Sequence, residues 1–435
     1  MSTPSTEILW FCRTGDSSSL SRITDSVIPH LTTSFNITLL SNKTSLKNVR
    51  NVIMGADTNT ITYKEFMQDQ IVTKETIRCL NMKYLVVQIV DLIYSGNFKY
   101  LVLCNGVYEI DWMTKMLTND PKYLTNQHGV RTKIIVWSPI DYIPTFPVVQ
   151  NIIRADLFLT MTPVMMTEIQ KCIISAHIPS IAWVGHGSDI NTDMSSNTTS
   201  IYDKLNRLRL TKQIVCKQSI KPSDIIILNA NNYGPLVDLS CVDNTPGTRK
   251  RLDITVKAFL KLLETRKDVK LWIHTNLKSF FDMLSIENIS LSSFADNVIL
   301  SNNTLSSEQL GMIYSVSQIT LQTSTGEGWS LTNLESAMYD SLQVVPDFLA
   351  CGWHFSENRG ILIPVTRKTI KNEGDIDVII GEVSVDDTYN KLLEALELLC
   401  HKEDLNKVLA SSKEYAKSYT WASVAERLIN LLDLI

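Results

Sequence analysis

The chain has 435 residues, which is too long for one ordinary hydrophobic core and predicts about two domains. Hydrophobic residues make up 44% and charged residues 20%, as is typical of a soluble globular protein. The net charge of -4 gives no basic excess of the kind that a nucleic-acid-binding protein usually has, so that class is not expected.

Eight cysteines are scattered along the chain, and no two stand at the CxxC spacing of a metal or redox site. Several lie in apolar runs, which is typical of reduced, buried thiols in a cytoplasmic protein. The N-terminus lacks the features of a signal peptide, and no apolar stretch reaches the roughly 18 residues that span a membrane. We therefore expect a cytoplasmic protein with no metal site. Peripheral contact with a membrane is not indicated.

Short apolar runs rich in β-branched residues recur in the first half, separated by longer mixed segments. Continuous apolar runs of this kind predict strands buried on both faces, as in a parallel sheet. The predicted strands cover residues 7–12, 37–40, 49–54, 100–104, 133–137, 157–160 and 181–184.

The second half repeats this alternation. Residues 253–263 form a helical pattern with Ile254, Ala258 and Leu262 on one face, and residues 331–339 predict a helix after a glycine-rich turn. Alternating strands and helices indicate βαβ units, and two such sets predict an α/β protein with two Rossmann-like, doubly wound domains. The predicted strands cover residues 224–228, 269–274, 297–300, 318–321, 342–345 and 360–364.

A polar stretch at 191–200, rich in Ser, Thr and Asn, separates the two halves and is typical of a linker. We therefore expect an N-terminal domain over residues 1–190 and a C-terminal domain over residues 191–412. Residues 231–248 predict a loop after the first strand of the second domain, and residues 413–432 predict a final amphipathic helix.

The most informative stretch is 323–335, which follows a predicted strand and opens a helix. Ligands of such sheets bind beyond the carboxyl ends of the strands. Gly326 and Gly328 permit close approach of the backbone to a ligand. The backbone N–H groups at the start of the helix, near Ser330 to Thr332, suit a diphosphate.

Two glutamates flank this turn. Glu335 lies over a turn further into the helix, where its carboxylate is placed to accept two ribose hydroxyls. Glu327 precedes the helix and is placed to face a sugar. From the residues alone, the alternative is an ordinary loop with Ser330 as the helix cap and a solvated Glu335.

Residues 327–338 read Glu-Gly-Trp-Ser-Leu-Thr-Asn-Leu-Glu-Ser-Ala-Met, with two glutamates separated by seven residues. This pattern resembles the hallmark of the retaining GT-B glycosyltransferases of family 4. Further segments match in order, so the resemblance covers most of the chain. These segments are 155–157, 185–189, 305–315, 344–347, 359–364 and 419–421.

The resemblance implies the GT-B fold, with two Rossmann-like doubly wound domains facing a central cleft. It implies that residues 413–435 form a C-terminal helix that returns to the N-terminal domain. It also places Trp329, Ser330, Leu331 and Thr332 with the two glycines and the two glutamates at the donor.

Family members place a Lys, often with an earlier Arg, on the donor phosphates, where cations neutralise the leaving group. The resemblance assigns Lys250 to this role, with Arg249 or Arg251 assisting. From the residues alone, the same run also fits a solvated surface before a helix. The segment matching the family's Asn-x-Asn-Arg ends in Asn231 and Asn232, so Asn231 is expected at the donor and Asn232 stands where the Arg would be.

Two positions in the first half complete the implied site. Gly15 lies in a strand–helix turn that approaches the donor phosphates in the family, although turn chemistry alone also explains a glycine there. The His that many relatives carry in the first domain is missing, and Asp141 stands at or beside its place. We expect Asp141 to contact the acceptor or the donor sugar, against the alternative of an Asp that opens a turn before Pro144. His186 is expected to be structural.

The resemblance implies transfer of a sugar from a nucleoside diphosphate sugar to a hydroxyl of a glycan, lipid or protein glycan. It implies retention at the anomeric carbon and no obligatory metal. The catalytic residues would be Glu327 at the donor sugar, Asp141 at the incoming hydroxyl and Lys250 at the leaving diphosphate.

Two alternatives stay open. One is a catalytically silent sugar-nucleotide-binding subunit, which the missing Arg, the missing His and Asp340 favour, since the family usually has Gly near position 340. The other is a GT-B sugar-nucleotide epimerase. A nicotinamide dehydrogenase is not indicated, because no GxGxxG follows the first strand of either half.

Overall fold

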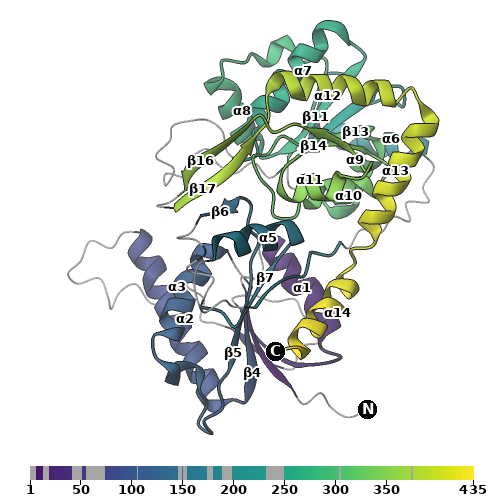
Figure 1. Ribbon diagram of the computed structural model, residues 1–435. Coiled ribbons are helices and arrows are strands. Elements are labelled where there is room, and N and C mark those ends of the chain that lie inside the picture. Colours follow the sequence, from purple (N-terminus) through teal and green to yellow (C-terminus); the bar gives the residue numbers. More distant parts are fainter. Residues whose placement is uncertain are drawn as a thin grey trace. The chain divides into compact units, whose positions relative to one another are not determined.

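The computed structural model describes residues 6–12, 19–41, 51–54, 74–104, 106–145, 149, 154–173, 180–188, 198–231, 249–302, 305–373 and 376–435. The chain divides into two compact units (Figure 1). Unit 1 comprises Met1–Ile140, Pro144–Gly187 and Thr420–Ile435, and unit 2 comprises Asp141–Ile143 and Ser188–Tyr419. Of the linker predicted at 191–200, residues 191–197 lie outside the described residues, and residues 198–200 form the start of a helix instead. Of the loop predicted at 231–248, residues 232–248 lie outside the described residues.

Unit 1 is built on a seven-stranded sheet in the order β3-β2-β1-β4-β5-β7-β8, in which every neighbouring pair is parallel. All seven strands predicted from the first half are confirmed, with bounds that shift by at most a few residues. The strands are β1 (Glu7–Cys12), β2 (Asn36–Ser41), β3 (Asn51–Met54), β4 (Phe98–Cys104), β5 (Lys133–Trp137), β7 (Leu157–Thr160) and β8 (Ser180–Trp183).

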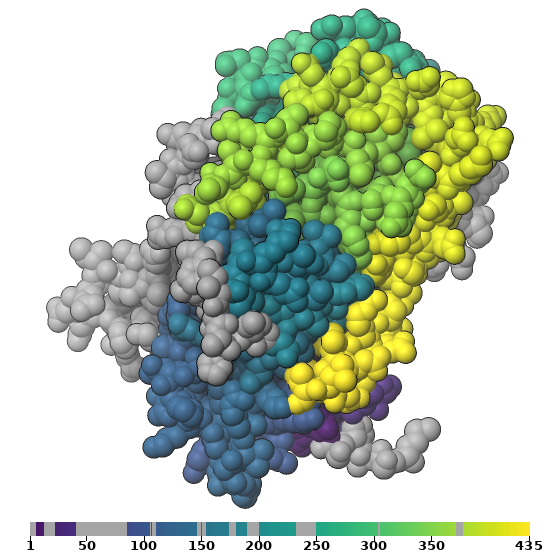
Figure 2. All heavy atoms as spheres, viewed as in Figure 1, coloured from purple at the N-terminus to yellow at the C-terminus, as the bar shows by residue number. Residues whose placement is uncertain are grey.

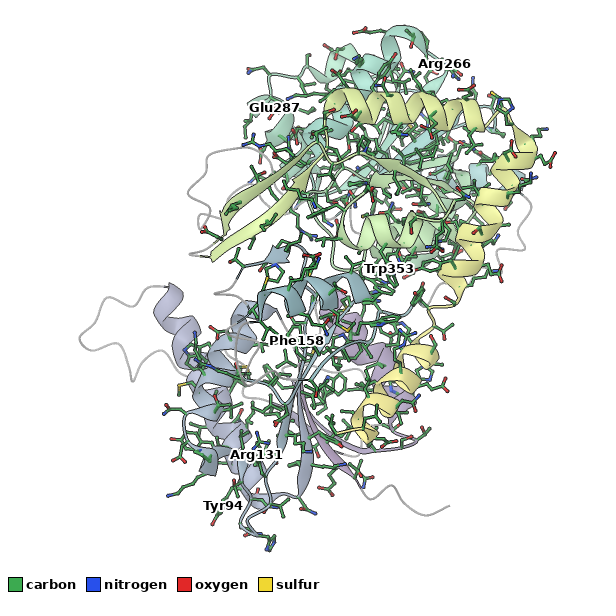
Figure 3. The ribbon with its side chains drawn as sticks, in the orientation of Figure 1. Tyr94, Arg131, Phe158, Arg266, Glu287 and Trp353 are labelled. Carbon is green, nitrogen blue, oxygen red and sulfur yellow. The ribbon has the colours of Figure 1, made fainter. Side chains whose placement is uncertain are left out.

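Helices cover this sheet and enclose large buried side chains. The Trp10 and Trp137 rings meet edge to face at 6.2 Å, and Phe158 also lies in the core, whereas Tyr94 and Arg131 lie at the periphery of the unit (Figure 3). The helices are α1 (Ser19–Leu31), α2 (Lys74–Ser95), α3 (Val107–Thr118), the 3₁₀ turn η1 (Pro121–Leu124), α5 (Pro163–Cys172) and α14 (Trp421–Asp433).

Two side chains hold the last helix against the sheet of unit 1, one from the sheet and one from the helix. The Tyr100 hydroxyl donates to the Leu432 carbonyl at 2.6 Å. The Arg427 guanidinium lies 4.0 Å from the centre of the Trp183 ring and donates to the Val184 carbonyl at 2.9 Å. These contacts place α14 against β4 and β8.

The prediction of one helix over residues 413–432 is wrong. The structure has α13 (Lys402–Lys417) in unit 2 and then α14 in unit 1. The first helix ends at Lys417, and Thr420 caps the second, because its hydroxyl accepts the Ser423 backbone N–H at 3.1 Å. The amphipathic pattern continues on both sides of this cap, so periodicity alone did not reveal the break.

Unit 2 contains a second seven-stranded sheet in the order β15-β14-β13-β10-β11-β12-β9. Its neighbours are parallel except for the antiparallel edge pair β12–β9. The six strands predicted from the second half are confirmed, and of the strands in this sheet the two-residue β9 was missed. The strands are β9 (Ile214–Val215), β10 (Ile225–Ala230), β11 (Val269–Thr275), β12 (Val298–Asn302), β13 (Ile319–Leu321), β14 (Leu342–Pro346) and β15 (Ile361–Ile363).

Helices lie on both faces of this sheet, as the predicted doubly wound arrangement requires. One core cluster joins the sheet to α7, α8 and α12, and a separate cluster joins it to α6 and α9. In Figure 2 the visible surface of unit 2 is formed largely by its later residues, coloured green to yellow. The helices are α6 (Thr198–Leu210), α7 (Leu252–Thr265), α8 (Leu277–Ile286), η2 (Leu291–Ser293), α9 (Ser307–Val316), α10 (Leu331–Ala337), α11 (Leu349–Phe355), α12 (Val385–Leu398) and α13.

A hairpin that the sequence did not reveal follows β15. Its strands β16 (Arg367–Glu373) and β17 (Ile376–Glu382) are antiparallel, and the short β6 (Ile143–Pro144) completes this sheet. At the end of β17 the Gly381 N–H donates to the Thr325 carbonyl at 2.9 Å. The hairpin therefore supports the loop that follows β13.

Candidate functional site

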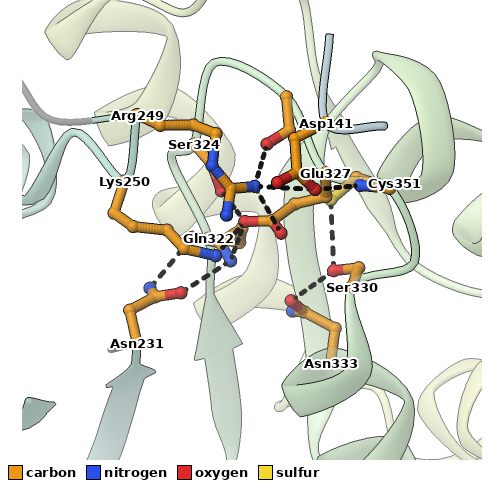
Figure 4. Close-up of polar contacts among 12 residues, drawn as sticks. Asp141, Asn231, Arg249, Lys250, Gln322, Ser324, Glu327, Ser330, Asn333 and Cys351 are labelled. Atoms are coloured by element: carbon orange, nitrogen blue, oxygen red, sulfur yellow. Dashed lines mark hydrogen bonds and ion pairs between the residues drawn. The ribbon is translucent and has the colours of Figure 1, made fainter. Parts of the chain in front are cut away.

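The candidate site lies at the carboxyl ends of the adjacent strands β10 and β13 in unit 2. Asn231 directly follows β10, and Gln322 directly follows β13. The turn that precedes α7 brings Arg249 and Lys250 to the same edge (Figure 4). This is the edge at which open α/β sheets bind their ligands.

Two cations converge on the Glu327 carboxylate. Lys250 Nζ lies 2.5 Å from Oε1, and Arg249 Nη1 lies 3.0 Å from Oε2. The Ser324 hydroxyl also donates to Oε1 at 2.6 Å. The Ala350 N–H at the start of α11 donates to the Glu327 carbonyl at 3.3 Å, so both the backbone and the side chain of Glu327 are held.

Glu327 is only 6% exposed, yet it is ionised. Burial by itself raises the pKa of this carboxyl group, but the charges of Arg249 and Lys250 and the hydrogen bonds from Lys250 and Ser324 outweigh burial and lower the pKa to about 2. The cluster is therefore a buried ion pair rather than a solvated surface run. The alternative interpretation of Arg249 and Lys250 as plain surface cations is wrong.

Asp141 is the second acid at this site. Its Oδ1 accepts the Gly328 backbone N–H at 2.7 Å and lies 3.1 Å from Arg249 Nη1. Its carbonyl oxygen would lie only 1.9 Å from a Cβ built on Gly326. Gly326 is therefore required by the approach of the Asp141 backbone, and its φ is not positive.

Buried amides extend the site along the sheet edge. Asn231 and Gln322 exchange two hydrogen bonds of 3.0 Å, and Gln322 Nε2 lies 3.4 Å from Glu327 Oε1. Asn231 also donates to Asn229 Oδ1 at 2.8 Å. Polar side chains at the ends of both strands thus form one hydrogen-bonded network that reaches the acid.

Three helices around the site begin at a non-glycine residue in the left-handed region. Arg251 precedes α7 with φ 43°, Ser330 precedes α10 with φ 62°, and Leu349 opens α11 with φ 47°. Such conformations cost of order 1–3 kcal/mol each and cluster at functional sites. Their grouping supports the location that the strand ends indicate.

Arg251 points away from Glu327. It pairs with Asp253 at 2.9 Å and with Glu382 at 3.2 Å, so it joins α7 to the hairpin. Of the two residues expected to assist Lys250, the structure brings Arg249 and not Arg251 to the cluster.

Ser330 does not cap α10 with its side chain. Its hydroxyl donates to Asn333 Oδ1 at 2.8 Å and accepts the Cys351 thiol at 3.3 Å. The capping alternative is therefore wrong. Leu331 and Thr332 lie partly exposed in the first turn of this seven-residue helix.

Glu335 is 2% exposed and accepts a hydrogen bond of 3.0 Å from the Tyr314 hydroxyl. The alternative of a solvated Glu335 is therefore wrong. Trp329 is also buried, with its ring edge to face against His354 at 4.5 Å and Tyr419 at 4.9 Å. Gly15 and Asn232 lie outside the described residues.

His186 belongs to unit 1 and not to this cluster. It is 3% exposed, its Nδ1 lies 2.6 Å from the Gly187 carbonyl, and its ring packs against Trp421 at 4.5 Å. These contacts agree with the structural role expected for it.

The residues that sequence reasoning missed are Gln322, Ser324 and Ala350. Gln322 was detectable in principle, because it is the first residue after a predicted strand. Ser324 and the Ala350 N–H had no sequence signal, since their role depends on where Glu327 lies.

Among the described residues, no group of three or more His, Cys, Asp or Glu is placed to hold a metal ion. No helix in that part of the chain is long and apolar enough to cross a membrane.

Comparison with solved structures identifies the architecture. The N-terminal domain of a Candida albicans trehalose-6-phosphate phosphatase matches with a TM-score of 0.64 at 11% identity, over 99% of this chain and 97% of that chain. The fold is GT-B. Sucrose-phosphate synthase from Thermosynechococcus elongatus matches with a TM-score of 0.63 at 10% identity, over 99% and 98% of the two chains.

Anabaena HepE, solved in complex with UDP and glucose, matches with a TM-score of 0.61 at 9% identity, over 99% of this chain and 100% of that chain. No protein-family model matches the sequence, and no curated protein matches it by sequence. The GT-B architecture expected from the sequence is thus confirmed, and the structure is similar to those of glycosyltransferases.

Proposed function

We propose that this protein is a glycosyltransferase that moves a sugar from a nucleoside diphosphate sugar to an acceptor hydroxyl, with retention at the anomeric carbon. The observation that carries the proposal is the convergence of Arg249 and Lys250 on Glu327 at the carboxyl ends of β10 and β13. Two adjacent cations suit a diphosphate, and a fixed hydrogen-bond acceptor suits a sugar next to it. The similarity to HepE, which was solved in complex with UDP and glucose, is in line with a site for a nucleoside diphosphate beside a sugar.

Each side chain then has a role that its position supports. Lys250 and Arg249 neutralise the charge that grows on the leaving diphosphate. Glu327 orients the donor sugar, and Glu335 binds the ribose. Asp141 lies 3.1 Å from Arg249 and accepts the Gly328 N–H, and we assign to it the orientation of the incoming hydroxyl.

The proposed reaction passes through an oxocarbenium-like transition state. A donor phosphate oxygen takes the proton of the acceptor hydroxyl, so no separate strong base is needed. The two cations supply the charge stabilisation that a divalent metal would otherwise give. We therefore propose turnover without an obligatory metal.

The test is release of nucleoside diphosphate from a panel of UDP-, GDP- and ADP-sugars, with and without EDTA. We expect release that survives EDTA and falls at least about 100-fold in each of two variants. Lys250→Ala removes a cation that stabilises the leaving diphosphate, and Glu327→Ala removes the side chain that orients the donor sugar. Glu287→Gln is the control, since Glu287 pairs with Lys257 outside the cluster.

The other outcomes identify the alternatives. Binding of a nucleotide without release from any donor would indicate a catalytically silent binding subunit. Conversion of the donor without an acceptor would indicate an epimerase. Release that disappears with EDTA would contradict the metal-independent reaction.

A further inference from the structure

The two cations of the candidate site are already neutralised by acids of the protein. Lys250 and Arg249 each bond one oxygen of Glu327, and Arg249 also lies 3.1 Å from Asp141. Arg249 Nη1 donates in addition to the Gly326 carbonyl at 2.8 Å. Two positive and two negative charges thus cancel at the place where a diphosphate is proposed to bind.

These contacts are buried rather than surface pairs. The exposed fraction of the side chain is 8% for Glu327, 17% for Lys250 and 30% for Arg249. Leaving a charge without a partner in such buried surroundings has a large cost in free energy. A ligand that takes the cations must therefore compensate for what Glu327 loses.

The groups that face Glu327 come from four segments. The two cations precede α7, Gln322 and Ser324 follow β13, and Asp141 lies beyond Arg249. From α11, the Cys351 thiol lies close enough for the Glu327 charge to help raise the thiol pKa, after burial, which is the larger cause. No cation other than Arg249 and Lys250 bonds Glu327 among the described residues.

We propose that Glu327 is an internal counter-anion, and that a diphosphate binds by displacing it from Arg249 and Lys250. This inference rests on the proposed function and specifies how its donor site is controlled. Glu327 then has two opposed effects: its charge weakens the binding of a bare diphosphate, while its hydrogen bonds position the sugar of a complete donor.

The exchange also predicts proton uptake. Once a dianionic ligand holds the cations, the Glu327 carboxylate remains buried beside negative charge. Both burial and like charge favour its neutral form. A proton is therefore taken up as the diphosphate binds, and the amount depends on the presence of a carboxyl group at position 327.

The experiment measures binding of inorganic pyrophosphate, UDP, GDP and ADP by calorimetry to wild type, Glu327→Gln and Glu327→Ala. We expect both variants to bind pyrophosphate and the preferred nucleoside diphosphate about tenfold more tightly than wild type, although they lose turnover. Glu287→Gln removes a negative charge elsewhere in unit 2 and should leave these affinities unchanged. Repeating the titrations at pH 7 in two buffers of different ionisation enthalpy should show more proton uptake by wild type than by either variant.

The outcomes separate the two proposals. Equal or weaker binding by both variants, with wild type still binding a diphosphate, would overturn the counter-anion role and leave the glycosyltransferase proposal standing. Equal proton uptake in wild type and variants would likewise overturn it. Absence of binding to every diphosphate, in wild type and variants alike, would contradict the proposed function and this inference with it.

Discussion

Gly326 is the residue at which the candidate site is most tightly packed. A Cβ at this position would meet the Asp141 carbonyl oxygen at 1.9 Å, and that oxygen belongs to the backbone, so it has no rotamer by which to move away. The same Asp141 holds the Gly328 N–H through its carboxylate. The loop and the Asp141 segment therefore fix one another on both sides of Glu327.

We predict that Gly326→Ala lowers the free energy of unfolding by about 2–3 kcal/mol, because overpacking forces the backbone to shift. Denaturant titration measures this loss. Gly106→Ala is the control, since nothing lies within 4 Å of its added Cβ, and its cost at a helix start should stay below about 1 kcal/mol. Equal costs for the two variants would show that the Asp141 contact does not constrain the loop.

At the scale of elements, the helices around the site begin differently from α9. The helices α7, α10 and α11 start at strained residues without a side-chain cap. By contrast, α9 starts with a complete capping box. In α9 the Ser306 hydroxyl accepts the Gln309 N–H at 3.2 Å, and Gln309 Oε1 accepts the Ser306 N–H at 2.9 Å. Three helices around the site thus start at strained residues, whereas α9 starts with an unstrained side-chain cap.

We predict that Ser306→Ala costs about 1 kcal/mol of stability, because it leaves the Gln309 N–H without its acceptor. Tyr314, whose hydroxyl bonds Glu335, lies in this helix. If the variant binds nucleotide less tightly, its thermal midpoint should therefore be lower as well. Ser285→Ala, at an exposed position of α8, is the matched control and should change stability by less than about 0.5 kcal/mol. Equal effects would contradict the capping role.

At the scale of the molecule, two buried histidines make stability depend on pH. Burial lowers the pKa of His354 to about 3 and that of His274 to about 4, from an ordinary value of 6.5. Both rings are therefore neutral in the folded chain, whereas the unfolded chain protonates them below pH 6.5. Their contribution is fully present above pH 6.5 and is lost as the pH falls toward the folded values.

We predict that each histidine lowers the free energy of unfolding by about 2 kcal/mol between pH 7.5 and pH 5. Urea unfolding at a series of pH values measures the slope. His354→Gln should flatten it, whereas His128→Gln, at an exposed position, should not. Glu327 adds little to this slope, because both its ordinary pKa of 4.5 and its pKa of about 2 in the folded chain lie below pH 5. An unchanged slope in the His354 variant would contradict this prediction.

The sequence by itself determined the parallel strands of the two large sheets, the helices near 253–263 and 331–339 and the stretch 323–335, because these follow from local periodicity and turn chemistry. It also identified Glu327, Lys250, Arg249 and Asp141 as candidates, through a resemblance to a known pattern. It did not determine the break before α14 or the β16–β17 hairpin. The break is a short cap and the hairpin contains an exposed polar strand, and neither changes the hydrophobic periodicity enough to be recognised.

The tertiary structure alone decided which charges meet. Arg249 and Glu327 are 78 residues apart, and Asp141 and Gly328 are 187 residues apart. They are brought together because β10 pairs with β13 and because residues 141–143 join unit 2. Strand order depends on how apolar faces pack over the whole domain, which no local pattern encodes. For the same reason the sequence could not show that Arg251 turns to Asp253 and Glu382 while Arg249 turns to Glu327.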